Sequence, residues 1–434
     1  MSIPSIMSKD PQQPASAGEE QKSSTNNLSE KLFTQHKQAK ETSGLTNYLP
    51  NDQQWLDERH ESEQASWYRS LRRMQWIWQG VDPVDLEEVL ARIASSTHSR
   101  TNDDWLDTVM GYRSGNWAYE WTKLGARYQK QAAELEGEQS ADRSFAASLC
   151  YSIAGYPHLK NDNLSLQAQV LANTAYDEGA KATSNYIRTI KIPFKKREIE
   201  ARLHVPHTQE PFPVVVVSAG LDSLQTDLWR LYRDYLRPRG IGMVTVDMPS
   251  VGSSSHWTLS EDSSEIHKAV VEHLPNLPWV AHNRVGLLGF RFGGNAMVRL
   301  SFLEQEKVRA CVSLGAPIHK VLSSPESIKA MPKVYLDMLA SRLGKTMVDI
   351  SSLSFFMMKW SLKVQGIINT RRTKVPILAI SMENDPICPA SDNQLVAMYS
   401  LGGKAKTVKS ANISQGYEQS LEMAIKWLEN ELLK

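Results

Sequence analysis

The sequence predicts an α/β fold in which a mostly parallel sheet follows an N-terminal helical domain. From residue 185 onward, short apolar segments rich in Val and Ile alternate with segments of helix length, as in sheets whose strands are joined by helical crossovers. Residues 28–184 show helical periodicity with few β-branched runs. At residues 285–294 an apolar strand runs into a glycine-flanked turn and then a helix.

Length and composition limit the possible functions. With 434 residues, of which 41% are hydrophobic, the chain can form more than one domain and bury large cores. The formal net charge of +1 gives no electrostatic reason to expect nucleic acid or a membrane as a partner. No run approaches about 18 apolar residues, and the polar N-terminus lacks the order of a signal peptide, so a cytoplasmic location is expected. The cysteines, Cys150, Cys311 and Cys388, include no CxxC pair, and we expect reduced structural thiols.

Residues 1–27 are rich in Ser, Pro, Gln, Glu and Lys, which predicts a disordered tail. A helical cap domain is then expected over residues 28–184. Its periodicity predicts helices at 64–78, 83–95, 103–112, 116–135, 143–155 and 164–183. Large aromatic residues at helical spacing favour packing between helices over an exposed binding face. The tryptophans concerned are Trp55, Trp67, Trp76, Trp78, Trp105, Trp117 and Trp121.

The α/β domain is expected over residues 185–434. Strands are predicted at 186–194, 197–205, 214–218, 242–247, 285–289, 308–314, 376–381 and 407–409. Helices are predicted at 226–238, 261–274, 295–304 and 417–433. The first two strands form a hairpin, which adds an antiparallel edge to the parallel sheet. Residues 319–370 lie between two core strands, where we predict a helical insertion that serves as a lid.

The turn at Gly289-Phe290-Arg291-Phe292-Gly293 has the spacing of a nucleophile elbow, the strained turn that presents the attacking residue in α/β-hydrolases. The usual pattern is G-x-S-x-G, in which small flanking residues leave room for the central side chain. Here Arg291 stands in place of the serine. An arginine cannot be deprotonated to a nucleophile in a protein, so the turn keeps the shape of an acyl-transfer site without its attacking atom.

Three further loops at the ends of predicted strands belong to the candidate site. Gly220 and Leu221 follow the strand at 214–218, and a backbone N–H from this loop is expected to form an oxyanion hole with the Phe292 N–H. Asp247 opens a turn similar to the D-x-P-G-x-G-x-S turn of α/β-hydrolases, and Asp385 stands where the acid of a triad would lie. The predicted substrate-binding residues are therefore Gly220, Leu221, Asp247, Arg291 and Phe292, and the candidate catalytic residues are Arg291 and Asp385.

The triad also lacks its histidine. In this fold the histidine follows the acid in sequence, but the last histidine of the chain is His319. Without an imidazole to orient, Asp385 fits a turn-capping role before Pro386 as well as a catalytic one. The serines at 253–255 beside His256 are more typical of a turn than of a nucleophile. No grouping of His, Cys and Asp has metal-ligand spacing, and no cofactor or metal is predicted.

Arg291 itself has two interpretations. Its guanidinium can bind the carboxylate or phosphate of a ligand over the N-terminus of the following helix. It can instead fill the pocket of the missing nucleophile by pairing with Asp385 or Asp247. The sequence leaves both interpretations open.

Five stretches together point to one family: residues 76–83 (WIWQGVDP), 111–117 (GYRSGNW), 156–160 (YPHLK), 247–252 (DMPSVG) and 289–293 (GFRFG). They resemble the FrsA family of fermentation-respiration switch proteins, from about residue 28 to the C-terminus, and the arginine in the elbow matches that family's pattern. The resemblance implies a cytoplasmic α/β-hydrolase behind a helical cap, with carboxylesterase activity on short esters. It also implies binding to the glucose-specific EIIA protein of the sugar phosphotransferase system.

Two functions of different class follow from these observations. One is hydrolysis of a small ester. The other is regulation, in which the pocket senses an anionic metabolite and the surface binds EIIA. A cofactor-free decarboxylase of a small 2-oxo acid is less favoured, because an arginine can hold the carboxylate but no residue supplies an electron sink.

Overall fold

The computed structural model describes residues 66–434 except 346–347 and 411–412. The predicted tail at 1–27, the start of the cap domain at 28–65 and Trp55 lie outside the described residues. All of the described residues belong to one compact unit, Ala39–Lys434. None of the described helices combines the length and apolarity needed to cross a membrane.

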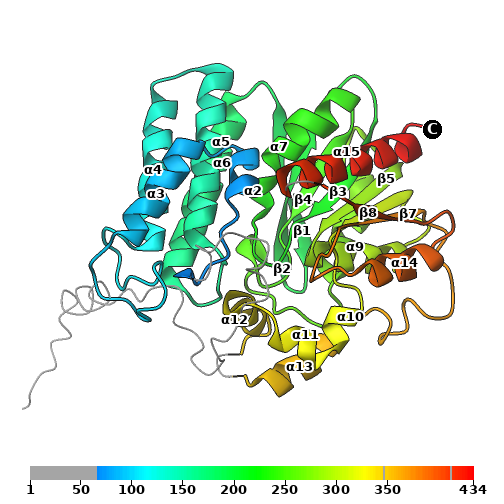
Figure 1. Cartoon of the computed structure of the whole chain (residues 1–434). Coiled ribbons are helices and arrows are strands. Elements are labelled where there is room, and N and C mark those ends of the chain that lie inside the picture. Colours follow the sequence, from blue (N-terminus) through cyan, green and yellow to red (C-terminus); the bar gives the residue numbers. More distant parts are fainter. Residues whose placement is uncertain (1–65, 346–347, 411–412) are drawn as a thin grey trace, which may run out of the picture. The chain divides into compact units, whose positions relative to one another are not determined.

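A sheet of eight strands lies at the centre of the described part (Figure 1). The strands are β1 Tyr186–Phe194, β2 Arg197–Val205, β3 Phe212–Ser218, β4 Gly242–Val246, β5 Val280–Phe290, β6 Ala310–Leu314, β7 Ile377–Met382 and β8 Lys404–Val408. Their order is β1-β2-β4-β3-β5-β6-β7-β8. β2 is antiparallel to both of its neighbours, and the remaining pairs are parallel. This confirms the prediction of a mostly parallel sheet that opens with an antiparallel hairpin.

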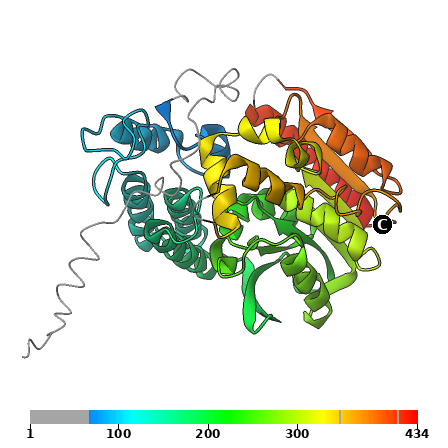
Figure 2. The same ribbon diagram turned by 90° about the horizontal axis from the view of Figure 1, so that it is seen from below.

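Helices cover both faces of the sheet (Figure 2), which explains why β3 and β4 are buried over their whole length. One face packs against α8 Glu265–His273, α9 Phe292–Leu303 and α14 Ala390–Met398. The other packs against α15 Ile413–Leu432 and the helical segment from Gln225 to Arg239. Neighbouring valines of β3 serve opposite faces: Val214 and Val216 belong to the first core, and Val215 and Val217 to the second.

One predicted helix on these faces was wrong, and one observed helix was not predicted. The helix expected at 226–238 is broken into η3 Gln225–Leu228, α7 Trp229–Leu231, the π turn η4 Tyr232–Leu236 and η5 Arg237–Arg239. Pro238 has no N–H to donate to the carbonyl of Asp234, so a regular helix cannot continue through it. Helix α14 was not predicted.

The helices before the sheet are α2 Arg73–Gln79, α3 Pro83–Ala94, α4 Trp117–Ala133, α5 Gly137–Gly155 and α6 Asn163–Ala182. No helix forms at 103–112, where one was predicted, and the segment consists of turns with a bridge between Arg100 and Val109. The hydroxyl of Thr108 donates to the carbonyls of Asn102 and Trp105, and such side-chain bonds compete with helical ones. The expected helix at 64–78 is limited to α2 among the described residues.

The tryptophans of this region are packed, as the sequence indicated. Trp67, Trp76, Trp117 and Trp121 belong to one buried cluster. The ring centroids of Trp76 and Trp121 lie 5.6 Å apart in an edge-to-face arrangement, which aromatic pairs prefer. Their burial explains why this region carries so many large aromatic residues.

The insertion between β6 and β7 is helical, as predicted. It contains α10 Lys320–Ser323, α11 Pro325–Lys329, α12 Lys333–Arg342 and α13 Ile350–Met358. These helices lie together in Figure 1 and follow the C-terminal end of β6. Since the C-terminal ends of the parallel strands carry the elbow, the insertion is placed next to the candidate site.

Close contacts join the helices before residue 185 to the sheet. The Tyr176 hydroxyl on α6 and the His204 ring on β2 share a hydrogen bond of 2.6 Å in the core. The rings of Phe145 on α5 and Trp229 on α7 are stacked with centroids 4.1 Å apart. Both contacts would be lost if the two regions separated.

We therefore expect limited proteolysis to cut first before Leu28, in the segment of polar composition, and to leave the remainder intact. The fragment should begin near residue 28 by N-terminal sequencing or mass spectrometry. A stable fragment that begins near Asn185 at early times would contradict a shared core between the two regions.

Candidate active site

Arg291 lies in the turn between β5 and α9 with φ 50° and ψ −123°, a backbone conformation that is strained for a residue other than glycine. Its N–H donates to the carbonyl of Leu314 at 2.8 Å, which holds the turn against β6. A Cβ at Gly293 would lie 2.3 Å from the carbonyl oxygen of Ala219, so only glycine fits there. The turn has the backbone geometry of a nucleophile elbow, with the arginine at its tip.

Arg291 forms an ion pair with the candidate acid. Its Nη1 lies 2.5 Å from Oδ2 of Asp385, whose side chain is 4% exposed. The other carboxylate oxygen of Asp385 accepts hydrogen bonds from the N–H groups of Ile387 and Cys388 at 2.9 and 3.2 Å. Asp385 therefore caps its turn and holds Arg291 at the same time. The Arg291 side chain remains 47% exposed, and it lines a cavity.

The cavity has a volume of about 1000 Å³ and lies at the C-terminal ends of the strands. Its walls include Gly220, Leu221, Phe292, Arg291 and Asp385, so the structure brings these predicted site residues together. Further walls come from residues 67–79 and from the insertion.

Asp247 is the predicted site residue that does not line the cavity. Its carboxylate is buried, and it accepts hydrogen bonds from the N–H of Gln225 at 2.7 Å and from the N–H and hydroxyl of Ser253 at 2.9 and 2.8 Å. These donors occupy the carboxylate, so Asp247 supports two neighbouring loops and does not meet a ligand directly. The same bonds commit Ser253 to the turn, as the sequence indicated.

The backbone offers free donors beside Arg291. Among the described residues, neither the Leu221 N–H nor the Phe292 N–H donates a hydrogen bond to another group of the protein. Phe292 is the first residue of α9, where N–H groups have no partner inside the helix and the helix dipole favours negative charge. This pair of donors is what an oxyanion hole requires.

A second ion pair, which the sequence analysis missed, lies in the same cavity. Arg72 pairs with the buried Asp222, and its Nη2 donates to the Tyr335 hydroxyl at 3.2 Å. Burial has the largest single effect on the pKa of Asp222 and raises it, but the charge and the hydrogen bond of Arg72, together with the charge of Arg342, outweigh burial. The net pKa is lowered, so the carboxylate is ionised at neutral pH. Asp222 could have been suspected from its place after Leu221. The residues around Arg72 in the sequence do not predict that it belongs to the site.

No histidine lines the cavity in the described part of the chain. His158, which is buried behind the loop of Leu221, has its pKa lowered to about 3 by burial, with the charge of Arg342 as the next cause. The described residues also contain no cluster of three or more His, Cys, Asp or Glu side chains that could hold a metal ion. The site therefore offers cations, N–H donors and carboxylates, but no serine beside an imidazole.

Comparison with known proteins places these features in a family. A family model described as esterase FrsA-like matches residues 23–433. The chain belongs to the FrsA-like esterase family. It is 65% identical over 411 residues to esterase FrsA of Vibrio cholerae, which covers 95% of this chain and 99% of that protein. It is 42% identical over 416 residues to esterase FrsA of Yersinia pestis, covering 94% and 99%.

Solved structures resemble this FrsA-like chain in fold. A 2,6-dihydroxy-pseudo-oxynicotine hydrolase has a TM-score of 0.66 at 19% identity and covers 83% of this chain and 95% of its own. A protein named AbyA5 has a TM-score of 0.62 at 18% identity, with coverages of 81% and 94%. The family resemblance and the α/β-hydrolase fold predicted from the sequence are thus confirmed, and the family is one of esterase-type hydrolases.

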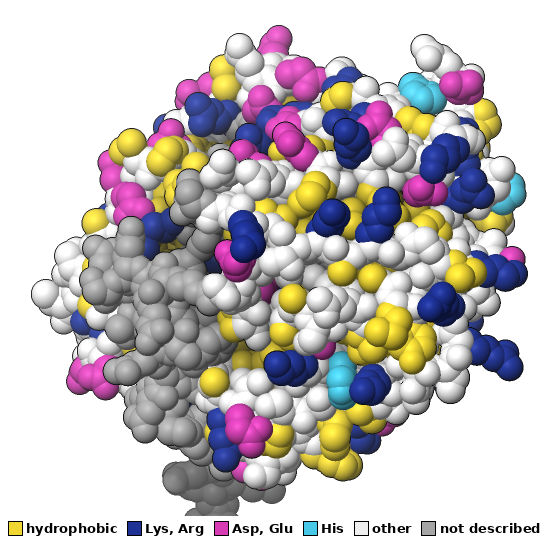
Figure 3. Space-filling model, turned by 45° about the vertical axis from the view of Figure 1, so that its right-hand side comes forward, with side chains coloured by type: hydrophobic (Ala, Val, Ile, Leu, Met, Phe, Trp, Pro, Cys, Tyr) yellow, Lys and Arg dark blue, Asp and Glu magenta, His cyan; other side chains and the backbone are white. Residues whose placement is uncertain are grey.

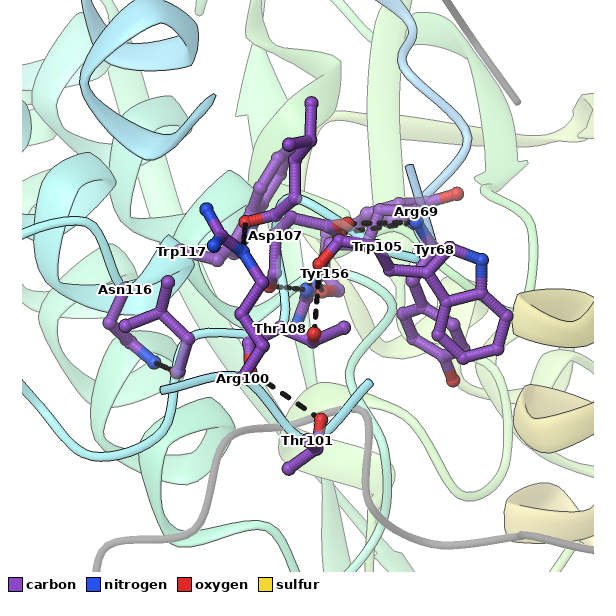
Figure 4. A network of polar contacts seen from close by, with 12 residues as sticks. Tyr68, Arg69, Arg100, Thr101, Trp105, Asp107, Thr108, Asn116, Trp117 and Tyr156 are labelled. Atoms are coloured by element: carbon purple, nitrogen blue, oxygen red, sulfur yellow. Dashed lines mark hydrogen bonds and ion pairs between the residues drawn. The ribbon is translucent and has the colours of Figure 1, made fainter. Parts of the chain in front are cut away.

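In this FrsA-like chain, a buried network fixes the segment that carries Arg72 (Figure 4). The Arg69 guanidinium and the Asp107 carboxylate are both fully buried and lie 2.9 Å apart. Arg69 also donates from Nε to the carbonyl of Tyr156 at 2.9 Å, and the Tyr68 N–H donates to Asp107 at 2.8 Å. A buried charge with this many partners defines one backbone path, so the wall of the cavity formed by residues 67–72 is held in place.

A second buried arginine ties the FrsA-like insertion to the site. Arg342, at the end of α12, is fully buried and donates from Nε to the carbonyl of Leu221 at 2.9 Å. Its Nη1 donates to the carbonyls of His158 and Ser250 at 2.6 and 2.8 Å, and its Nη2 donates to that of Pro157 at 2.8 Å. One guanidinium therefore joins the helical region, the insertion and two loops at the strand ends.

Asp227 lies next to the loop of Leu221 and lines the cavity. Burial raises its pKa from an ordinary value of 3.8 to about 7, and the carboxylates of Asp247 and Asp222 add to this effect. One of its carboxylate oxygens accepts from the N–H of Leu224 at 3.0 Å. The folded protein thus holds a proton on Asp227 that the unfolded chain releases at a lower pH.

Because the folded protein still holds this proton between about pH 4 and about pH 7, where the unfolded chain has released it, the contribution of Asp227 to the free energy of unfolding should fall as the pH rises over this range, by at most about 1.4 kcal/mol per pH unit. Asp227→Asn removes this titration. The melting temperature of the variant relative to wild type should rise between pH 5 and pH 8 in thermal unfolding. The same difference at both pH values would contradict a raised pKa for Asp227.

Proposed function

We propose that this FrsA-like protein is a carboxylesterase that hydrolyses small carboxylic esters by direct attack of water. The observation that carries the proposal is the retained elbow, in which two free N–H groups, those of Leu221 and Phe292, lie beside a cation and not beside a serine. Such donors stabilise the tetrahedral oxyanion whichever nucleophile attacks. The short esters implied by the family resemblance are the first substrates to test.

The residues divide the reaction between them. Leu221 and Phe292 donate to the oxyanion that forms on the ester carbonyl, and Arg291 adds a positive charge that Asp385 keeps in place. Asp222 is ionised and accepts a proton from the attacking water. The proton then passes to the leaving alcohol, so that one ester and one water give one acid and one alcohol. No covalent intermediate forms.

Asp222→Asn tests this assignment. The amide oxygen can still accept a hydrogen bond from Arg72, but the amide cannot take a proton, so kcat for p-nitrophenyl butyrate should fall about 100-fold or more with little change in KM. Asp142→Asn, at an exposed position outside this cavity, is the matched control. Full activity of the Asp222 variant would remove this residue from the mechanism.

A second function is favoured because the described residues place no activated nucleophile beside Arg291. In this alternative the chain is a cytoplasmic regulator that binds an anionic metabolite through Arg291 and docks the glucose-specific EIIA protein. Basic side chains are spread over the face shown in Figure 3, with acidic and apolar ones among them. Together with the net charge of +1, this supports a local contact and not a broad electrostatic one.

Calorimetric titration with purified EIIA at low and at physiological salt tests the alternative. Binding at both, with an affinity that changes less than about 10-fold, is expected for a local contact. Absence of binding at either salt concentration would remove EIIA as a direct partner of this chain.

A further inference from the structure

The cavity at Arg291 has an extensive apolar wall that hydrolysis of a short ester does not use. The side chains of Leu221 and Phe292 belong to the same buried apolar cluster as side chains of the insertion. The insertion residues that both belong to this cluster and line the cavity are Val321, Leu322, Met331, Met338, Leu339 and Met357. The apolar wall therefore begins at the residues that form the oxyanion hole.

Most charged groups of the cavity come from other elements, and the one from the insertion, Lys333, is paired with Asp337 of the same helix at 2.8 Å. Arg291 and Asp385 belong to the loops after β5 and β7, and Asp222 to the loop after β3. Arg72 is supplied by the segment before α2. Apart from Lys333 and from Tyr335, whose hydroxyl accepts a hydrogen bond from Arg72, the insertion residues that line the cavity are apolar. The reaction centre therefore lies between a charged wall and a largely apolar one.

The size of the cavity indicates what the apolar wall contacts. A volume of about 1000 Å³ is at the upper end of the range of roughly 300–1000 Å³ for pockets that enclose drug-sized ligands. A short ester would leave most of this space, and the apolar wall with it, to water. Methionine is unbranched and adapts to flexible chains, which suits a wall that must accept an alkyl chain.

We infer that the substrate carries a medium-length apolar acyl chain, of about eight carbons, which packs along the insertion wall while its carbonyl lies at the Leu221 and Phe292 N–H groups. The inference rests on the proposed esterase function for the position of the carbonyl. It assigns the substrate class, longer than the short esters that the family resemblance implies, and gives the insertion a role in selecting the acyl chain.

The first test is the chain-length profile of the full-length protein with p-nitrophenyl acetate, butyrate and octanoate. Each methylene that becomes buried should raise kcat/KM up to about fourfold, so the octanoate should exceed the butyrate by at least about 30-fold. A profile that is flat, or that falls from acetate to octanoate, would overturn the inference while leaving the esterase function in place.

The second test does not depend on catalysis. Calorimetry with sodium octanoate and sodium acetate compares the same carboxylate with and without the chain, and octanoate should bind at least about 100-fold more tightly. If no ester is hydrolysed but octanoate binds in this way, the esterase proposal fails and the acyl-chain site is supported. Equal binding of the two acids would overturn the site.

Two adjacent methionines of α13 give a matched pair of variants. Met357 is 1% exposed and lines the cavity, whereas Met358 is 37% exposed and does not. Met357→Ala should weaken octanoate binding about 10-fold and leave acetate unchanged, and Met358→Ala should change neither. Met331→Ala probes the same wall at a second point if the first variant folds poorly. Loss of octanoate and acetate binding by the same factor would contradict an acyl-chain contact.

Discussion

Arg342→Met should destabilise the protein by at least about 4 kcal/mol, because it leaves four buried carbonyls without their donor at about 1–3 kcal/mol each. The guanidinium is fully buried and bonds the carbonyls of Leu221, Pro157, His158 and Ser250. Burial lowers the pKa of Arg342 only to about 10, so the group remains charged at neutral pH. A methionine of similar length fills the space but has no hydrogen-bond donor.

Thermal unfolding of three variants separates the causes. Arg342→Lys keeps a charge and up to three donors, so its melting temperature should lie between those of wild type and Arg342→Met. Arg371→Met, at an exposed position, should leave the melting temperature unchanged. If the free energy of unfolding of Arg342→Met lies within about 1 kcal/mol of the wild-type value, the carbonyl contacts contribute little and Arg342 does not anchor the loops.

Arg291→Ala should lower kcat/KM for esters by about 100- to 1000-fold, the loss expected when one group that stabilises an oxyanion is removed. The side chain lines the cavity at the tip of the elbow, and its removal also leaves the Asp385 carboxylate without its cation. Both changes make the site less able to hold a developing negative charge. Steady-state kinetics with p-nitrophenyl butyrate measures the effect, with Arg371→Ala as the control.

Arg291→Ser should be as slow as Arg291→Ala. The substitution restores the G-x-S-x-G pattern, but no histidine lines the cavity in the described part of the chain to activate the hydroxyl. A serine variant faster than wild type would show that a base lies within reach of position 291 and would contradict this expectation.

The fold could be predicted well because each strand or turn is determined by residues within its own segment. Glycines flanking residue 291, apolar runs such as Val214–Val217 and the turn at Lys195-Lys196 each specify their own segment. The helix expected at 103–112 does not form: besides the local bonds of the Thr108 hydroxyl, the segment is held by Asp107, which accepts hydrogen bonds from Tyr68 and Arg69, almost 40 positions away in the sequence. Helical periodicity does not report such contacts.

The candidate site was predictable only in part for the same reason. Gly220, Leu221, Arg291, Phe292 and Asp385 follow strands whose ends meet at one edge of the sheet, so the fold alone brings them together. Arg72 and Arg342 come from outside the strand order and reach the site through tertiary packing. Asp247 also follows a strand, but its carboxylate is occupied by Gln225 and Ser253. The sequence does not show whether a carboxylate can bind a ligand or is already hydrogen-bonded within the protein, because its partners come from other segments of the fold.

The chain is proposed to hydrolyse esters at Arg291 without a covalent serine intermediate. Intact-mass spectrometry of the full-length protein after treatment with a fluorophosphonate, together with stopped-flow hydrolysis of p-nitrophenyl butyrate, tests this proposal most directly. We expect an unmodified mass, no burst of p-nitrophenol, and turnover limited to the roughly 10³- to 10⁴-fold acceleration that an oxyanion hole and binding provide. A phosphonylated serine mapped by peptide sequencing, at residues 253–255 or elsewhere, accompanied by a burst of one equivalent, would contradict it.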